Sequence, residues 1–194
     1  MGVKMIKAVL FDFFGVISDE VAPPWFSRYF NEEDAVRLKA QIFERADLGL
    51  ISEEETYAEM SEISGIPKDR IREEFYSLVK INRELVEYIK SLREKYKVYL
   101  LSNAPEGFLR RVLQDNDLYP LFDGLFISCE IGLKKPSGAY YVYALKNIGI
   151  RPEEAFFTDD NPENISAARA IGINAEVFTG TRSLKRALLA HGIR

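Results

Sequence analysis

The stretch IKAVLFDFFGVIS, residues 6–18, decides the fold. Its first part, Ile6 to Phe11, is a short and largely apolar run without helical periodicity, and Asp12 and Gly15 follow it closely. Such a run predicts a buried strand that ends in a tight loop. A strand of this kind opens a sheet with its polar residues at the carboxyl edge, where ligands bind in parallel sheets.

Predicted strands and helices alternate along the second half of the chain. Strands are expected at Lys97–Ser102, Gly124–Ser128, Ala155–Thr158 and Asn174–Phe178. Helices are expected from Asn82, over Glu106–Asn116, Ala139–Ile148 and Pro162–Ile171, and from Ser183. Helices of this length between strands imply right-handed crossovers. We therefore expect an α/β fold with a doubly wound, parallel, Rossmann-like sheet.

A helical segment interrupts this alternation after the first strand. From about Asp19 to Lys80 apolar residues recur at helical spacing, and Ser52 and Glu55 form a capping box that predicts a helix start. We interpret residues 18–81 as a small helical cap inserted over the carboxyl edge of the sheet. The core then comprises residues 1–17 and 82–194, joined to the cap near residues 16–19 and 79–82.

The composition excludes several kinds of active site. Among 194 residues there is one cysteine, Cys129, and one histidine, His191, so an internal disulfide, a cysteine zinc cluster and a histidine-centred triad are not expected. Acidic residues exceed basic ones by 30 to 26, which argues against a nucleic-acid binder. No signal peptide or membrane-spanning run is recognisable. We expect a cytoplasmic protein whose chemistry uses carboxylates, hydroxyls, ammonium groups and backbone amides.

Polar side chains gather at the predicted strand ends and in the loop after the third strand, namely Asp12, Ser102, Asn103, Lys135, Asp159 and Asp160. Each has a plain structural alternative: a turn at Asp12, a helix cap at Ser102 and Asn103, a helix start before Pro162, and solvated surface at Lys135. Their convergence on one edge favours a site for magnesium-assisted phosphoryl transfer instead.

Four motifs carry a resemblance to a known superfamily. VLFDFFGVI, VYLLSNAPEG, IGLKKPSGAYY and AFFTDDNPENISAARAIGI, in that order, resemble the motifs of the haloacid dehalogenase-like (HAD) hydrolases. The chain is most similar to the branch with a small helical cap after the first motif. That branch holds sugar-phosphate phosphatases, the phosphatase domain of epoxide hydrolases and 2-haloacid dehalogenases, and the resemblance covers nearly the whole chain.

The resemblance implies a nucleophile and a Mg²⁺ site. Asp12 would attack phosphorus and form an aspartyl-phosphate. Asp12, Asp160 and the backbone carbonyl of Phe14 would bind Mg²⁺. Asp159 would support the metal site or serve as an alternative ligand, and Asn164 matches a supporting position.

The resemblance also implies phosphate-binding groups. Ser102 and the amide of Asn103 would bind the transferred phosphoryl oxygens, and Lys135 would neutralise the nucleophile and the developing charge. Gly15 would let main-chain amides approach the phosphate. The expected partner is a small phosphorylated metabolite, with neither nucleic acid nor membrane involved.

Phe14 departs from the pattern, because family phosphatases usually carry a second Asp at this position. That Asp protonates the leaving oxygen and later activates water, a contribution of roughly 10²- to 10⁴-fold. Three functions stay open. A phosphatase without this acid would favour acyl, aryl or anomeric sugar phosphates. A dehalogenase usually has an aromatic residue here, but it has no use for the Asp159–Asp160 pair. A non-catalytic phosphate binder is the third.

Substrate recognition is expected to depend on the cap. The aromatic residues and the Arg of one short helix could face the pocket, although packing within the cap is the favoured interpretation; these are Trp25, Phe26, Arg28, Tyr29 and Phe30. Arg45 is a weaker candidate of the same kind.

Overall fold

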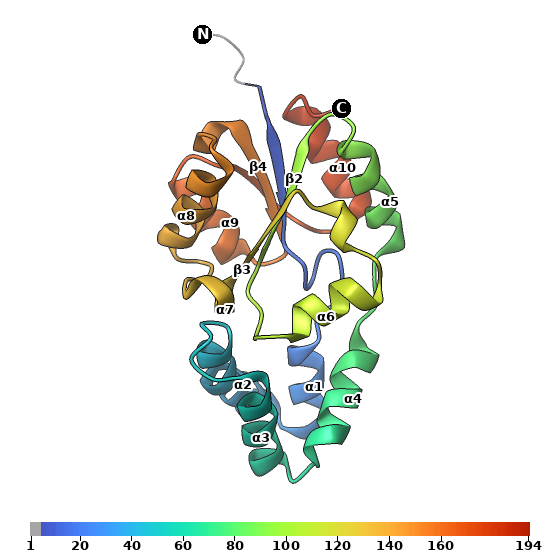
Figure 1. The fold of residues 1–194 in the computed structure, drawn as a ribbon, viewed down its shortest axis with the longest axis vertical. Coiled ribbons are helices and arrows are strands. Elements are labelled where there is room, and N and C mark those ends of the chain that lie inside the picture. Colours follow the sequence, from blue (N-terminus) through green and yellow to red (C-terminus); the bar gives the residue numbers. More distant parts are fainter. Residues whose placement is uncertain (1–4) are drawn as a thin grey trace.

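Five parallel strands form a single sheet in the computed structural model, which describes residues 5–194 (Figure 1). The strand order is β3-β2-β1-β4-β5. The strands are β1 (Ala8–Phe11), β2 (Lys97–Ser102), β3 (Gly124–Ile127), β4 (Ala155–Asp159) and β5 (Asn174–Val177). The expected fold class is thereby confirmed. The first four residues assigned to the core lie outside the described residues.

Apolar side chains project from both faces of the sheet into two hydrophobic clusters. In β1, Val9 and Phe11 pack on one face, and Ala8 and Leu10 pack on the other, as the two-residue period of a strand requires. Helices α5 (Arg83–Leu92), α6 (Phe108–Asp115) and α10 (Thr181–Ala190) contribute to the first cluster, and α8 (Gly138–Ile148) and α9 (Pro162–Ala170) to the second. The sheet is therefore the middle of three layers.

Several element boundaries differ from the sequence-based prediction by one or two residues. β3 ends at Ile127, and Ser128 begins the short helix α7 (Ser128–Ile131). Helix α6 starts at Phe108 because Gly107 has a φ of +78°, outside the helical region. The described chain also has two 3₁₀ turns, η1 (Tyr119–Leu121) and η2 (Pro152–Glu154). Among residues 5–194, no helix combines the length and the apolar character needed to span a bilayer.

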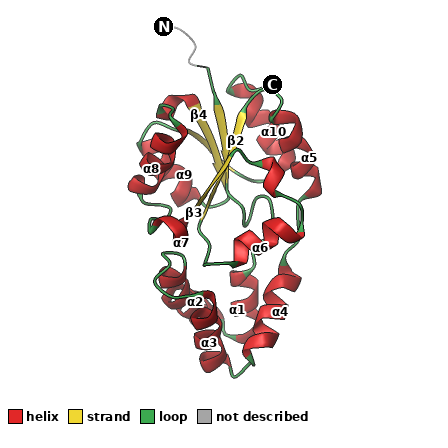
Figure 2. Cartoon of the chain, in the orientation of Figure 1, coloured by secondary structure: helices red, strands yellow, loops and turns green. Residues whose placement is uncertain are grey.

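Four helices lie together beyond the carboxyl ends of the strands (Figure 2). They are α1 (Ala22–Tyr29), α2 (Glu32–Ala46), α3 (Glu53–Ser64) and α4 (Lys68–Leu78). The Ser52–Glu55 capping box is present at the start of α3, as predicted. The two chain segments that join these helices to the sheet run side by side, since Asp19 N–H donates to Lys80 and Asn82 N–H donates to Ile17 over 3.0 and 2.9 Å.

Candidate active site

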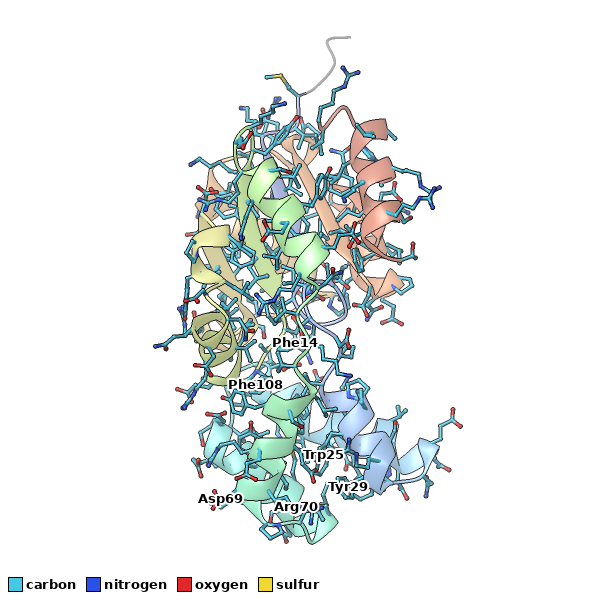
Figure 3. The ribbon with its side chains drawn as sticks, turned by 90° about the vertical axis from the view of Figure 1, so that its right-hand side faces the viewer. Phe14, Trp25, Tyr29, Asp69, Arg70 and Phe108 are labelled. Atoms are coloured by element: carbon cyan, nitrogen blue, oxygen red, sulfur yellow. The ribbon has the colours of Figure 1, made fainter. Side chains whose placement is uncertain are left out.

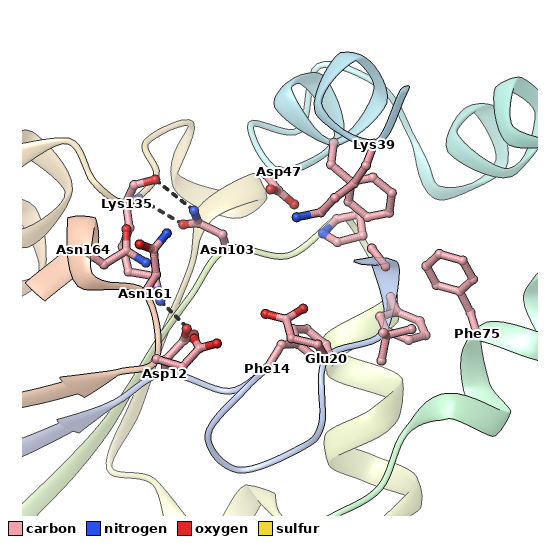
Figure 4. Close-up of a pocket in the computed structure, with 16 residues that line it drawn as sticks. Asp12, Phe14, Glu20, Lys39, Asp47, Phe75, Asn103, Lys135, Asn161 and Asn164 are labelled. Atoms are coloured by element: carbon pink, nitrogen blue, oxygen red, sulfur yellow. Dashed lines mark hydrogen bonds and ion pairs between the residues drawn. The ribbon is translucent and has the colours of Figure 1, made fainter. Parts of the chain in front are cut away.

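Three neighbouring strands deliver polar side chains to one edge of the sheet. Asp12 directly follows β1, Ser102 ends β2 and Asp159 ends β4, while Lys135 lies in the loop before α8. Parallel strands that are adjacent in a sheet place their carboxyl ends together. The structure thus brings these residues to one edge of the sheet, although Asp12 and Asp159 are far apart in the sequence. Figure 4 shows Asp12 and Lys135 at this edge.

Lys135 lies between two carboxylates. Its Nζ is 2.7 Å from Asp12 Oδ1 and 2.6 Å from Asp159 Oδ2, and its side chain is almost completely buried. Burial would lower the pKa of Lys135, but the two carboxylates outweigh it and hold the pKa above its usual value. For Asp12 the balance is opposite, because burial raises its pKa more than Lys135 lowers it. The site therefore has more negative charge than one ammonium group neutralises.

Both carboxylate oxygens of Asp159 are bonded to protein groups. Besides Lys135, it accepts from Asn164 Nδ2 at 3.0 Å to both oxygens and from the Asn161 N–H at 2.8 Å. Burial alone would raise the pKa of Asp159, but these donors outweigh it and hold the pKa below its usual value. Asn161 caps α9 by accepting from Glu163 N–H. The helix-start interpretation thus holds for Asn161, and leaves both aspartates to the site.

Asp160 faces the loop after β1. One carboxylate oxygen of Asp160, one of Asp12 and one of Asp159 all lie within 4.8 Å of each other. Gly15 leaves space for the Asp160 carboxylate, because a Cβ at position 15 would lie only 2.3 Å from Asp160 Oδ2. Its φ of +80° is also a conformation that favours glycine. The Gly15 N–H donates to Ser18 carbonyl at 2.7 Å, so within the loop this amide has a protein partner. Burial and then the charge of Asp159 raise the pKa of Asp160.

Ser102 and Asn103, at the carboxyl end of the adjacent strand β2, provide further polar groups at this edge. The Ser102 hydroxyl is completely buried and has no partner among the described residues. The Asn103 side chain exchanges two 2.9 Å hydrogen bonds with the Lys135 backbone, and this pairing positions the lysine loop. Asn103 is therefore not a helix cap, because α6 begins after Gly107 without a side-chain cap bond. The Ser102 hydroxyl, as a buried donor without a partner, is suited to an anionic ligand.

A cavity of about 180 Å³ opens onto this edge, between the sheet and helices α1–α4. It is lined by the predicted site residues Asp12, Phe14, Asn103, Lys135, Asp160 and Asn164. Sequence reasoning missed other lining residues, among them Glu20, Lys39, Phe43, Asp47, Phe75 and Phe108. Glu20 could have been found as a carboxylate just after the first loop, whereas nothing in the local sequence marks the others.

The aromatic side chains and the arginine of α1 are not among the described residues that line this cavity, although Ala22 at the start of the helix is. Trp25 and Tyr29 both donate to Glu74 of α4, over 2.9 and 2.8 Å, and Phe26 is completely buried (Figure 3). Arg45 pairs with Glu59. The favoured interpretation of α1, packing among the helices rather than contact with substrate, therefore holds for these described residues.

Two of the known proteins with similar sequences are named as phosphatases. The chain is 27% identical over 188 residues to the D-ribitol-5-phosphate phosphatase of Bacteroides thetaiotaomicron, covering 87% of this chain and 89% of that protein. It is 27% identical over 172 residues to the sesquiterpene phosphatase astK of Aspergillus oryzae, covering 86% and 87%. It also matches drimenol cyclase drtB of Aspergillus calidoustus at 24% identity over 191 residues, where it spans only 36% of that protein.

Solved structures and a family match agree with these relatives. A HAD family enzyme of Bacteroides thetaiotaomicron, solved in complex with magnesium and inorganic phosphate, superposes with a TM-score of 0.74 at 26% identity, covering 89% of this chain and 93% of that one. Residues 6–172 match the haloacid dehalogenase-like hydrolase family. With this match over most of its length, its doubly wound sheet and its aspartate-lined edge, the chain belongs to the haloacid dehalogenase-like hydrolases and is an enzyme.

Proposed function

We propose that this hydrolase is a Mg²⁺-dependent phosphatase that acts on a small phosphorylated metabolite through an aspartyl-phosphate on Asp12. One observation carries the proposal: the carboxylates of Asp12, Asp159 and Asp160 meet at the edge of the sheet, and the ammonium group of Lys135 is bonded to the first two. A dehalogenase needs one nucleophilic aspartate and no such cluster. The phosphatase relatives named above point to the same class of reaction.

The residues present fit a magnesium ion. Asp159 is occupied by Lys135 and Asn164, which leaves Asp12 and Asp160 as the carboxylates with free oxygens. No described N–H donates to the Phe14 carbonyl, which could be a third oxygen ligand. Mg²⁺ prefers such a set of one or two carboxylates completed by water and phosphate oxygens. When bound, the ion would neutralise charge on the transferring phosphoryl group.

Asp12 would act as the nucleophile. One carboxylate oxygen forms a bond to phosphorus while the bond from phosphorus to the leaving oxygen breaks, and the leaving oxygen takes the electron pair. The Phe13 N–H, which donates to Asp12 Oδ1 at 2.7 Å, and Lys135 fix the orientation of the carboxylate. Ser102 and the Asn103 N–H would donate to the phosphoryl oxygens as negative charge develops there. Water then cleaves the aspartyl-phosphate and releases inorganic phosphate.

Phe14 determines which substrates can react quickly. Its side chain lines the cavity where family phosphatases carry an acid, and it can neither donate nor accept a proton. Leaving groups that depart unprotonated are therefore favoured: acyl, aryl and anomeric sugar phosphates.

We further propose that residues 18–81 act as a cap that closes the cavity. Lys134, next to the catalytic lysine, forms a 2.8 Å ion pair with Glu44 of α2, and the rings of Tyr76 from α4 and Phe108 from α6 are 4.9 Å apart. These contacts join the helical segment to the core around the site. Closure excludes water from the reacting groups.

A paired assay tests the proposal. The protein is incubated with p-nitrophenyl phosphate and Mg²⁺, with and without EDTA, and in parallel with 2-chloropropionate. Phosphate release that EDTA abolishes supports a phosphatase. Metal-independent halide release would instead identify a dehalogenase, and inactivity on both substrates would favour a phosphate binder. Asp12→Asn is the control, because it should abolish either activity.

A further inference from the structure

We propose that Glu20 is the general base of the second half-reaction, in which it accepts a proton from the water that cleaves the aspartyl-phosphate on Asp12. This inference rests on the proposed phosphatase function and adds a catalytic residue to it. The step gains from such a base, because a positioned proton acceptor makes water a better nucleophile. Phe14 stands where family phosphatases carry that base, and its ring cannot accept a proton.

The backbone holds Glu20 between the end of β1 and the start of α1. The loop after β1 folds back on itself, since the Ser18 N–H donates to the Phe13 carbonyl at 2.9 Å. The next amide, that of Asp19, donates to the Lys80 carbonyl at 3.0 Å, and α1 begins two residues after Glu20. Fixed backbone on both sides of Glu20 limits the positions that its side chain can reach.

The Glu20 side chain lines the same cavity as Asp12, Phe14 and Asp160. Figure 4 shows its carboxyl group pointing into this space. The residue is half-buried, and among residues 5–194 its carboxyl group has no hydrogen-bond or ion-pair partner. Its oxygens are therefore free to accept a hydrogen bond, and then a proton, from a water molecule in the cavity.

The other carboxylates at this edge have other roles. Asp12 is the proposed nucleophile, and Asp160 has the free oxygens proposed for Mg²⁺. Asp159 is completely buried, and both of its oxygens are bonded to protein groups. Asp47 also lines the cavity, but it follows α2, and the charge that acts on it most strongly is that of Lys134. Among the described residues that line the cavity, the remaining carboxylate is that of Glu20.

The charges around Glu20 suit a base rather than an acid. Burial and then the charge of Asp160 raise the pKa of Glu20, with a smaller contribution from Asp159, and this strengthens the carboxylate as a proton acceptor. The ammonium groups of Lys39 and Lys135 act in the opposite direction and favour the ionised form. An ionised carboxylate accepts a proton but has none to donate. Glu20 therefore serves the attacking water, and the preference for leaving groups that depart unprotonated is kept.

The step itself is the hydrolysis of an acyl phosphate. The water oxygen forms a bond to phosphorus while one water proton passes to a carboxylate oxygen of Glu20. The bond from phosphorus to the Asp12 oxygen breaks, and its electron pair returns to the Asp12 carboxylate. Inorganic phosphate leaves, and Glu20 releases its proton to solvent. Both carboxylates are thereby restored for the next turnover.

Pre-steady-state kinetics with p-nitrophenyl phosphate isolate this step, because the aryl leaving group needs no proton. In Glu20→Gln the first turnover, which phosphorylates Asp12, should keep a rate constant within about twofold of wild type, while kcat falls about 100-fold or more. p-Nitrophenolate should then appear in a burst close to about one equivalent per enzyme molecule, larger than that of wild type. Intact mass spectrometry after acid quenching should find the phosphoryl group on the variant.

Asp19→Asn is the matched control, because Asp19 is the neighbouring carboxylate, is exposed and is not among the described residues that line the cavity. It should keep kcat within about twofold of wild type and give no larger burst. Glu20→Asp keeps a carboxylate on a shorter side chain and provides a second test if Glu20→Gln does not fold. Its kcat and its burst should lie between those of wild type and those expected for Glu20→Gln.

Two results would overturn the role of Glu20 and leave the phosphatase proposal standing. One is a Glu20→Gln enzyme with wild-type kcat and no larger burst. The other is an equal loss in the first turnover and in kcat, which would place Glu20 in substrate binding or in the phosphorylation of Asp12. Wild-type protein that releases no p-nitrophenolate in the presence of Mg²⁺ would overturn both the phosphatase proposal and this inference.

Discussion

The rings of Phe14 and Phe108 stack with their centroids 5.8 Å apart and their planes 19° apart. Phe108 in turn contacts Phe75 and Tyr76 of α4, with centroids 6.0 and 4.9 Å away. Figure 3 shows Phe14 and Phe108 between the sheet and the helical segment. Phe14 therefore joins the loop after β1 to the helical segment through an aromatic series. Phe14 therefore has a packing role at a position where family phosphatases usually carry an acid.

Phe14→Asp should raise turnover of alkyl phosphates more than that of aryl phosphates. A carboxyl at this position can protonate an alkoxide leaving group, whereas p-nitrophenolate departs without help. We expect about a tenfold or greater gain in kcat on glucose 6-phosphate and a smaller one on p-nitrophenyl phosphate. Phe14→Leu, which removes the ring without adding an acid, should give no gain. Equal gains on both substrates would contradict the leaving-group interpretation.

Asp159 and Asp160 should differ in their response to the metal. Asp160→Asn removes a free carboxylate and should increase the Mg²⁺ concentration needed for half-maximal rate by at least about tenfold. Asp159→Asn weakens the bonds to Lys135 and Asn164 and should lower kcat about 10- to 100-fold with a smaller change in Mg²⁺ requirement. Measuring the rate of each variant over a series of Mg²⁺ concentrations gives both its Mg²⁺ requirement and its kcat. A larger shift for Asp159→Asn would reverse the two assignments.

Gly15→Ala should damage the site as well as the fold. A non-glycine residue at a φ of +80° costs about 1–2 kcal/mol, and the new Cβ would displace the Asp160 carboxylate. We expect lower stability in urea unfolding and a higher Mg²⁺ requirement. Gly65→Ala is the control, because Gly65 has a φ of +71° but nothing within 4 Å of an added Cβ. That variant should lose similar stability and keep wild-type kinetics.

Asp47 should make the free energy of unfolding depend on pH. Burial raises its folded-state pKa to about 7, above roughly 3.9 in the unfolded chain. Between these values the folded state holds a proton that the unfolded chain has released. The free energy of unfolding therefore decreases as pH rises from about 4 through about 7. Lys39 and Lys134 face the carboxyl group and reduce this effect, and Glu44 increases it.

Asp47→Asn removes this dependence. Relative to wild type, the free energy of unfolding of the variant should increase by about 2 kcal/mol between pH 5 and pH 7.5, measured by urea unfolding. Asp69→Asn on α4 is the control, since the Asp69 side chain is 90% exposed. The change there should stay below about 0.5 kcal/mol. A pH-independent difference for Asp47→Asn would show that the carboxyl is well solvated in the folded protein.

Lys39 and Asp47, which line the cavity, show what sequence reasoning could not reach. Lys39 lies within the polar helix α2 and Asp47 directly follows it, and a charged residue in such a segment is usually a solvated surface group. Trp25 and Tyr29 are the opposite case. Aromatic residues near a site suggest a binding surface, but in the structure both side chains donate hydrogen bonds to Glu74 and pack among the helices. The local sequence pattern cannot show whether a side chain lines a cavity, packs in the interior or faces solvent. Its environment depends on how the helices pack against one another.

The sequence by itself determined the sheet, the order of its elements and the residues at its carboxyl edge. A buried parallel strand has a strong local signature, and adjacent strands of such a sheet must bring the residues that follow them together. Only the tertiary structure decided how charge is shared there: Lys135 bonds to both Asp12 and Asp159, while Asp160 faces Gly15. These distinctions depend on distances of a few ångströms between residues far apart in the chain, and they result from the packing of complete layers.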